Sequence, residues 1–406
     1  MSYKYTYYTC LTNNIDSKSS DGTVEPNLQF NESRENPIIT NTKDYEVCIT
    51  SFKLDTKSLP SFIPIIKYVE SSAPTTDQKL ETIYEVTYSV VKNTETYSYT
   101  QPIHFKQQDE TVSVPDFIKG YANYESGYYN LYNFENFFTT INVALRNCLK
   151  GLRTVYDIYF GTGSFDLAYV LSGTWTQFAI PYFIFDKDSR MAYINAPVIN
   201  FNPSTPKLSL YLNTPLYRLF DSLPFQLNNY TFNTLLSNEK ITKTVKLYKM
   251  NFNNFEGSNI VSIYPKIITT TVDTIPVKID HYVIYQDYET LSSWSPVESI
   301  VITSSTLPIS PCFVSQNQSY VNVVETTEGS MNITEMELLD FRGADVKPGI
   351  IYNPTNFRWV NLLDMHELKT INFQVFYRLK INGQLIPFKI SSGGNFSLKL
   401  CFRKLK

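Results

Sequence analysis

The chain has 406 residues, of which 43% are hydrophobic, and a formal net charge of -3. This hydrophobic content excludes an intrinsically disordered chain. The balance of 35 Lys and Arg against 38 Asp and Glu argues against a dedicated nucleic-acid binder, which needs a concentrated basic surface. At ~100–200 residues per domain, the length predicts two or three structural units or one large β domain.

The residue types favour β-structure and offer few of the side chains that catalytic sites use. The chain contains 31 Tyr and 27 Phe, but only 14 Gly and 3 His. Aromatic side chains suit the half-buried faces of sheets and are enriched in the cores of subunit interfaces. The scarcity of His and Gly leaves little material for most catalytic sites and phosphate-binding loops.

The first segment, residues 1–26, is polar and predicted to be an extended arm that becomes ordered against neighbouring subunits. Strand-like patterns follow at residues 45–54, 83–91 and 96–105. The apolar stretch at residues 59–66 contains two prolines, which favours an edge or a packed loop over a central strand.

One helix is predicted from an apolar stripe with steps of three and four residues. Asn133 can cap it, Glu135 lies in its first turn, and Lys150-Gly151 is expected to end it. An amphipathic surface helix normally packs such a stripe on the core, so we interpret it as a core contact and not as a cofactor site. The stripe consists of Phe134, Phe137, Phe138, Ile141, Leu145, Cys148, Leu149 and Leu152.

Further short strands are predicted at residues 178–185, 191–201, 208–212, 260–264 and 277–285. Asp186-Lys187-Asp188-Ser189 is a turn signal between two of them. Its two alternate carboxylates lack the rest of a calcium-binding loop.

The last part of the chain has the clearest pattern. Residues 371–381 alternate between apolar and polar, Asn382-Gly383 predicts a type I′ turn, and residues 384–390 return as the partner strand. Residues 396–402 alternate again after a Ser391–Gly394 hinge, which predicts a third antiparallel strand. Many short strands with few helices indicate an all-β fold, a β-sandwich or jelly roll.

Every common catalytic motif is incomplete. His366-Glu367 begins a zinc-protease motif, but Thr370 stands where the second His belongs. Gly161 and Gly163 begin a dinucleotide-binding pattern whose third position is Asp166. We therefore predict no catalytic, cofactor-binding or metal-binding residues, and no enzyme activity.

Isolated His and Cys residues do not change this expectation. His104, His281 and His366 lie far apart and are interpreted as structural or surface residues. The five cysteines form no CxxC pair and are expected to be reduced thiols. They are Cys10, Cys48, Cys148, Cys312 and Cys401.

No signal peptide is expected at Met1–Thr6, and no apolar run reaches the ~18 residues that span a bilayer. The protein is therefore expected in the cytosol or nucleus, with no membrane span.

Several segments resemble the minor capsid, or penton, proteins of virophages and polinton-like viruses, which are jelly-roll capsid proteins. They are scattered over most of the chain, and they fit a major capsid protein as well as a penton. The segments are residues 28–39, 44–45, 51–54, Leu59-Pro60-Ser61-Phe62-Ile63-Pro64-Ile65, 128–137, 294–309, Ile351-Tyr352-Asn353-Pro354, Ile386-Pro387-Phe388, 392–394 and 397–400.

The resemblance implies a structural protein of the virion, made in the host cytoplasm or a virus factory, with five copies around an icosahedral vertex and contacts to other capsid proteins. The expected organisation is an N-terminal arm (1–26), a jelly roll (27–120 and 238–406) and an inserted region with one amphipathic helix (121–237). Two β-barrels, 27–225 and 226–406, are the alternative. They would make the chain a double jelly-roll major capsid protein that forms trimers.

Two further expectations concern partners. A receptor-binding or glycan-binding virion protein is an alternative function, for which exposed Tyr, Trp175 or Trp294 in a shallow groove would be the sign. The basic cluster of Lys399, Arg403, Lys404 and Lys406 is either a solvated tail or a contact to packaged nucleic acid.

Overall fold

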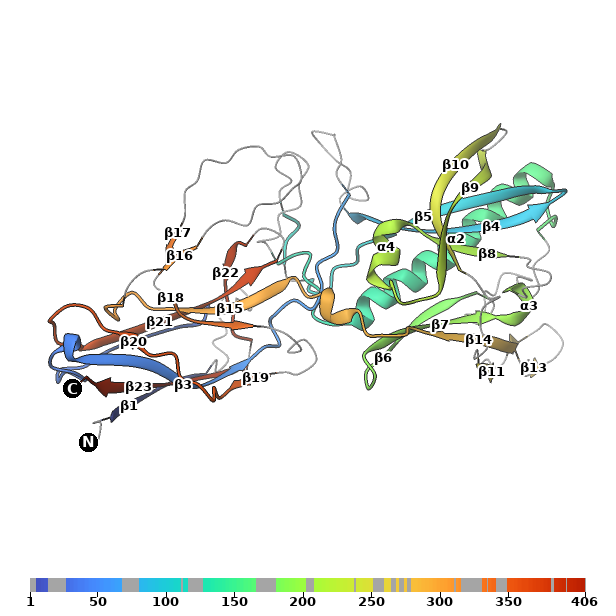
Figure 1. The fold of residues 1–406 in the computed structure, drawn as a ribbon. Coiled ribbons are helices and arrows are strands. Elements are labelled where there is room, and N and C mark those ends of the chain that lie inside the picture. The colour runs from blue at the N-terminus through green and yellow to red at the C-terminus, as the bar shows by residue number, and fades with distance from the viewer. Residues whose placement is uncertain are drawn as a thin grey trace. The chain divides into compact units, whose positions relative to one another are not determined.

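The computed structural model shows two compact units (Figure 1). Unit 1 combines Met1–Ser61 with Ser295–Lys406, and unit 2 is Phe62–Trp294. The structure describes residues 5–13, 27–67, 80–110, 112–115, 127–165, 180–201, 208–236, 239–250, 259–263, 268–269, 274–275, 279–309, 312–314, 331–333, 335–340, 349–380, 383–391 and 393–405.

Unit 1 is a sandwich of two antiparallel sheets. The first has the strand order β1 (Tyr5–Asn13), β23 (Asn395–Lys404), β3 (Tyr45–Asp55) and β19 (Gly349–Tyr352), and the short β20 (Val360–Asn361) also pairs with β3. The second has the order β18 (Glu335–Asp340), β15 (Val297–Thr303), β21 (Thr370–Leu379) and β2 (Gln29–Ser33), and β22 (Leu385–Pro387) also pairs with β21.

The core of unit 1 forms because its strands alternate. Every second residue of β21, from Ile371 to Leu379, is buried. On β23, Phe396, Leu398, Leu400 and Phe402 are buried in the same way. The rings of Phe52 and Phe396 meet edge to face, with centroids 5.5 Å apart.

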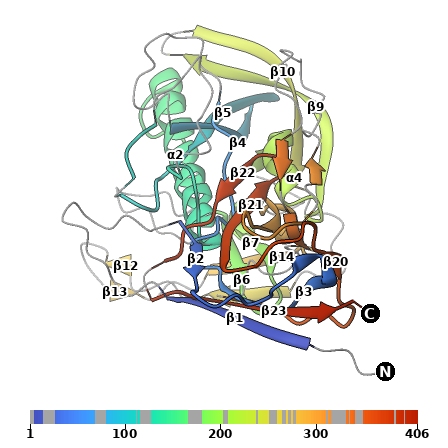
Figure 2. The ribbon, with the colours of Figure 1, turned by 90° about the vertical axis from the view of Figure 1, so that its left-hand side faces the viewer.

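The connectivity is that of a jelly roll. Numbered first to eighth along the chain, the eight main strands are β1, β2, β3, β15, β18, β19, β21 and β23, and the sheets have the orders 1-8-3-6 and 5-4-7-2. Figure 2 shows β1 and β23, from opposite ends of the chain, lying side by side. The predicted all-β jelly roll with a helix-bearing insertion is confirmed, and unit 2 enters between the third and fourth strands.

Unit 1 differs from expectation in two elements. Residues 5–13, predicted as part of the arm, form β1, while residues 14–26 lie outside the described residues. The third C-terminal strand, β23, pairs with β1 and β3 instead of continuing from β22. The chain changes sheet at a turn where Gly393 has a φ of 72°, which favours glycine. Asn382 of the predicted type I′ turn is not described, and Gly383 beside it has a φ of 68°.

Unit 2 contains a closed barrel, a second sheet and a long helix. The elements of the barrel, in pairing order, are β10 (Glu239–Met250), β8 (Ser209–Leu212), β4 (Glu81–Lys92), β5 (Glu95–His104) and β9 (Phe225–Leu236). The second sheet has the order β11 (Asn259–Ile263), β14 (Ile279–Tyr285), β7 (Met191–Pro197) and β6 (Tyr182–Asp186).

Shorter strands and helices lie between these main elements. In unit 2 they are the strand pair β12 (Ile268–Thr269) and β13 (Thr274–Ile275), the helices α3 (Val198–Phe201) and α4 (Thr214–Leu219), and the 3-10 turn η3 (Leu291–Ser293). In unit 1 they are the pair β16 (Cys312–Val314) and β17 (Met331–Ile333) and the 3-10 turn η1 (Thr42–Asp44).

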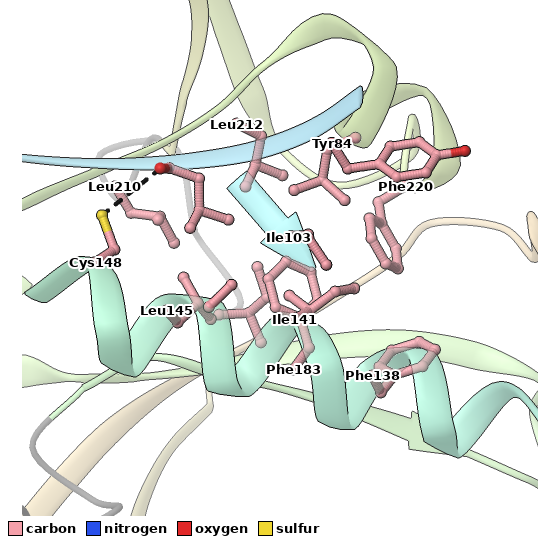
Figure 3. Close-up of a cluster of buried hydrophobic side chains, with 14 of the residues drawn as sticks. Tyr84, Ile103, Phe138, Ile141, Leu145, Cys148, Phe183, Leu210, Leu212 and Phe220 are labelled. Atoms are coloured by element: carbon pink, nitrogen blue, oxygen red, sulfur yellow. Dashed lines mark hydrogen bonds between the residues drawn. The ribbon is translucent and has the colours of Figure 1, made fainter. Parts of the chain in front are cut away.

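Helix α2 (Phe134–Phe160) carries the core of unit 2 (Figure 3). All eight residues of the predicted stripe are buried, and Asn133 Oδ1 accepts the predicted cap bond from Glu135 N at 2.8 Å. The helix does not end at Gly151 but continues to a C-cap at Gly161, whose φ of 102° suits glycine. Gly151 serves packing, because a Cβ there would lie 2.3 Å from Cε1 of Tyr99 on β5. No described helix is long and apolar enough to cross a membrane.

The compact units are bounded differently from the predicted domains. The predicted jelly roll included residues 81–104, but these form β4 and β5 of unit 2, because β4 pairs with β8 and packs on α2. Only one of the two units is a jelly roll, whereas the alternative of two barrels assumed two similar halves.

Candidate assembly surface

The exposed side of the first sheet of unit 1 is the most distinctive surface of that unit. We call it the outer face and define it by Tyr5, Tyr7 and Leu11 of β1, Lys399 and Arg403 of β23, and Ile351 of β19. Strand alternation creates it, because Tyr8 and Cys10 of β1 point into the core while their neighbours point outward.

One row across the outer face is polar. Tyr5, Arg403 and Glu46 are register partners on β1, β23 and β3. Arg403 Nε donates to Glu46 Oε1 at 2.5 Å, and its guanidinium carbon lies 4.1 Å from the centroid of the Trp359 ring. The hydrogen bond to Glu46 raises the pKa of Arg403. This ion pair therefore holds the end of β23 to β3, with Trp359 stacked on it.

The next row contains Tyr7, Cys401 and Cys48. Both cysteines are buried and neither forms a disulfide, although they lie on the outward side of their strands. The neighbouring Cys401 raises the pKa of Tyr7, and burial raises the pKa of Cys401. Lys399 Nζ lies 5.0 Å from the centroid of the Tyr7 ring.

A third row is apolar at both ends. Leu11, Ser397, Lys53 and Ile351 are register partners across all four strands. Leu11 is 67% exposed, Ile351 is 69% exposed and Tyr7 is 59% exposed. Large apolar side chains therefore lie at both edges of the outer face, and each would lose exposed apolar surface if another protein covered this face.

The edge strand β1 is firmly held on one side and open on the other. Tyr8 OH donates a hydrogen bond to Glu32 Oε2 on β2, and Arg34 lies over the Tyr8 ring at 5.2 Å. The hydrogen bond from Tyr8 is the main reason that the pKa of Glu32 is lowered. Among the described strands, β1 pairs with β23 alone. Its outer edge offers backbone groups that a neighbouring chain can cover.

The second sheet has a different exposed side. Two of its rows place amide-bearing residues in register, Gln29 with Gln374 and Asn31 with Asn372. A third pairs hydroxyls, where Ser33 Oγ and Thr370 Oγ1 lie 2.8 Å apart. Because the polar rows need no cover, the outer face is the stronger candidate for a permanent contact.

The predicted basic cluster is the end of a strand and not a tail. Arg403 is paired with Glu46, and Lys399 lies over the Tyr7 ring. Lys404 is exposed at the end of β23, and Lys406 lies outside the described residues. Two of the four cations therefore have partners within the subunit.

The histidines and the Asp186 turn lie at exposed positions or within strands and turns. His104 and His366 are exposed, while His281 is buried on β14 with its ring 6.1 Å from that of Tyr182. Asp186 accepts hydrogen bonds from Asp188 N and Ser189 Oγ, which makes the predicted turn between β6 and β7. No three His, Cys, Asp or Glu side chains are grouped to hold a metal within the part of the chain that the structure describes. Trp175 lies outside that part, and Trp294 is buried.

Comparison with known proteins agrees with this fold. A family model described as Sputnik minor capsid protein V18/19 matches residues 6–404. A chain of the Sputnik virophage, determined by cryo-EM at 3.5 Å, is 18% identical with a TM-score of 0.68, covering 98% of each chain. The mavirus penton protein, known from a crystal structure, is 15% identical with a TM-score of 0.58, covering 99% of this chain and 100% of its own. The search of curated proteins found no match.

Proposed function

The chain belongs to the Sputnik minor capsid protein V18/19 family, and on this premise we propose that it is the penton subunit of an icosahedral virus capsid, which assembles as a ring of five copies. The observation that carries the proposal is one complete jelly roll interrupted by a unit of another architecture. The fold shared with the mavirus penton protein supports it.

The single jelly roll also supports a penton subunit over the alternative of a major capsid protein. That alternative requires two jelly rolls side by side, each of which supplies a similar sandwich. Unit 2 instead combines a five-stranded closed barrel with a four-stranded sheet and the 27-residue helix α2. The trimer that the alternative implies is therefore not part of the proposal.

The proposed contact between neighbouring copies is the outer face with the open edge of β1. Burying Leu11, Ile351 and Tyr7 against another subunit removes exposed apolar surface at about 25 cal/mol per Å². Permanent interfaces bury ~2,000–5,000 Å², although affinity does not scale with area alone. Other capsid proteins of the shell are the second class of partner.

The proposal extends to where the protein acts and how. As a virion component made in the host cytoplasm or a virus factory, it acts through contacts and not through catalysis. Packaged nucleic acid is left out of the proposed partners, because Arg403 and Lys399 are already engaged within the subunit.

The mass of the purified protein in solution tests the assembly. We expect light scattering to give about five times the 46.9 kDa of one chain. A mass of three chains would instead favour the major capsid protein. A protein that stays monomeric at all concentrations would count against both.

A charge-insertion variant tests the contact surface. The double substitution Leu11→Lys and Ile351→Lys leaves the fold intact, because both side chains are more than 60% exposed. We expect it to shift the pentamer to monomers at micromolar concentration. The matched control is Ile158→Lys, which changes a side chain that is 62% exposed on α2 of unit 2 and should keep the pentamer. A double variant that still forms pentamers would remove the outer face from the proposed interface.

A further inference from the structure

The barrel of unit 2 contains a cavity that the proposed function does not use. Its volume is about 200 Å³, and strands β4, β5, β8, β9 and β10 supply its lining. At ~30 Å³ per water, this space holds six or seven waters or one small ring-shaped molecule. Barrel interiors are a common place for small-ligand sites.

Three aromatic rings form one wall. The centroid of the Tyr211 ring lies 4.9 Å from that of Tyr230 and 5.2 Å from that of Phe232. Tyr230 and Phe232 are stacked, with centroids 6.1 Å apart and planes 18° apart. Tyr211 and Phe232 are buried, while Tyr230 is only partly covered. A partly exposed aromatic wall suits the flat apolar face of a sugar ring.

Hydroxyl groups lie beside this wall. Ser89 is 2% exposed, and its Oγ donates to Tyr211 OH at 3.1 Å. Burial raises the pKa of Tyr211, which keeps its hydroxyl protonated and able to donate a hydrogen bond. Ser209 and Thr231 also line the cavity. A few hydroxyls on an aromatic lining are the groups that fix the orientation of a polar ligand.

A lysine lies in the same cavity, and it forms no ion pair with any residue in the described part of the chain. Lys249 of β10 lines it, with Nζ 5.9 Å from the centroid of the Tyr211 ring. Its pKa is lowered, and burial is the only cause, with no carboxylate contributing in the described part of the chain. Moving a cation out of water costs free energy unless an anion lies beside it. An anionic ligand would offset that cost.

We propose that the barrel cavity of unit 2 binds a single sugar ring that carries a carboxylate, with the ring against Tyr211 and Tyr230 and the carboxylate on Lys249. This site is separate from the outer face of unit 1. It gives the capsid subunit a means of recognising acidic glycans in addition to its place in the shell.

The test uses the assembled full-length protein and defined probes. Binding of the methyl glycosides of N-acetylneuraminic acid and glucuronic acid is measured by saturation-transfer NMR and calorimetry, beside methyl galactoside and acetate. We expect millimolar binding of at least one acidic sugar, and at least tenfold weaker binding of the neutral sugar and of acetate.

Two cavity variants and one control locate the site. Lys249→Met should weaken binding of the acidic sugar at least tenfold, and Tyr230→Ala should do the same by removing part of the wall. Lys246→Met changes an exposed lysine on the same strand and should leave binding unchanged. Near-UV circular dichroism of each variant checks that the barrel is folded.

Three outcomes would overturn the proposal. They are no binding of either acidic sugar, equal binding of the neutral sugar, or binding that survives Lys249→Met and Tyr230→Ala in folded protein. None of them alters the mass in solution, so a failure of this site is distinguishable from a failure of the penton assignment.

Discussion

The pair formed by Arg403 and Glu46 is the residue-scale contact that holds the last described strand in place. Glu46 is 8% exposed, so its carboxylate depends on Arg403 for compensation. We expect Arg403→Met to lower the free energy of unfolding, because a charged acceptor is left poorly paired. Urea denaturation measures this loss.

The control for this substitution is a more exposed lysine at the end of β3. Lys57 Nζ lies 3.7 Å from Asp55 Oδ2, and the lysine side chain is 60% exposed. Lys57→Met should therefore change stability by less than about 1 kcal/mol. Adding Glu46→Leu to Arg403→Met should restore part of the loss, and a double variant as weak as the sum of both changes would contradict the pairing argument.

The buried thiol of Cys148 should make unit 2 less stable as the pH rises into the alkaline range. Burial raises its pKa to about 12, above the ordinary value of about 8.5. The folded state thus favours the neutral thiol, so its contribution is complete below pH ~8.5 and is lost as pH rises toward 12. Urea denaturation between pH 8 and 10.5 should show a shallower decline for Cys148→Ser than for the unmodified chain. Equal slopes would rule out this thiol as a cause.

At the scale of elements, the packing of α2 on β5 depends on Gly151. Gly151→Ala gains about 1 kcal/mol in helix propensity, but the new Cβ meets the Tyr99 ring. Overpacking costs about 1–3 kcal/mol, so we expect a net loss in stability, measured by the helical circular dichroism signal in urea. Thr154→Ala, at an exposed position of the same helix, should be neutral or stabilising. Adding Tyr99→Leu should relieve the loss.

The elements that sequence predicts well are those whose pattern is local. The strands β3, β4, β5, β21 and β23 and the start of α2 follow from alternation or from steps of three and four residues. The end of α2 does not, because Gly151 is explained by a ring on another element and not by a cap. Strand β10 has little alternation, since most of its side chains are exposed. The outer face was missed because β1 is polar enough to resemble an arm and gains its face only by pairing with β23.

At the scale of the whole molecule, unit 2 has the properties of an inserted domain. Its first and last residues, Phe62 and Trp294, lie together with ring centroids 5.2 Å apart. Ends that meet in this way allow a domain to be inserted without disturbing its host. The insertion could be expected from the sequence, but its bounds could not, since they depend on the long-range pairing of β4 with β8.

We therefore predict that the two units unfold separately. Calorimetry of the full chain should show two transitions, and residues 62–294 expressed alone should reproduce one of them. Unit 1 with a short Gly-Ser linker in place of unit 2 should reproduce the other. A single transition, together with unfolded fragments, would mean that neither unit is stable without the other.

The pairing of Tyr5 with Arg403 has a consequence for synthesis. At ~5–20 residues per second, a ribosome needs ~20–80 s to make the chain between these partners. During that time the contiguous unit 2 can fold, whereas β1 waits for β23. The outer face is therefore incomplete until β23 has been made and has paired with β1. The order of strands in the jelly roll thereby delays formation of the proposed contact surface until both of these strands are available.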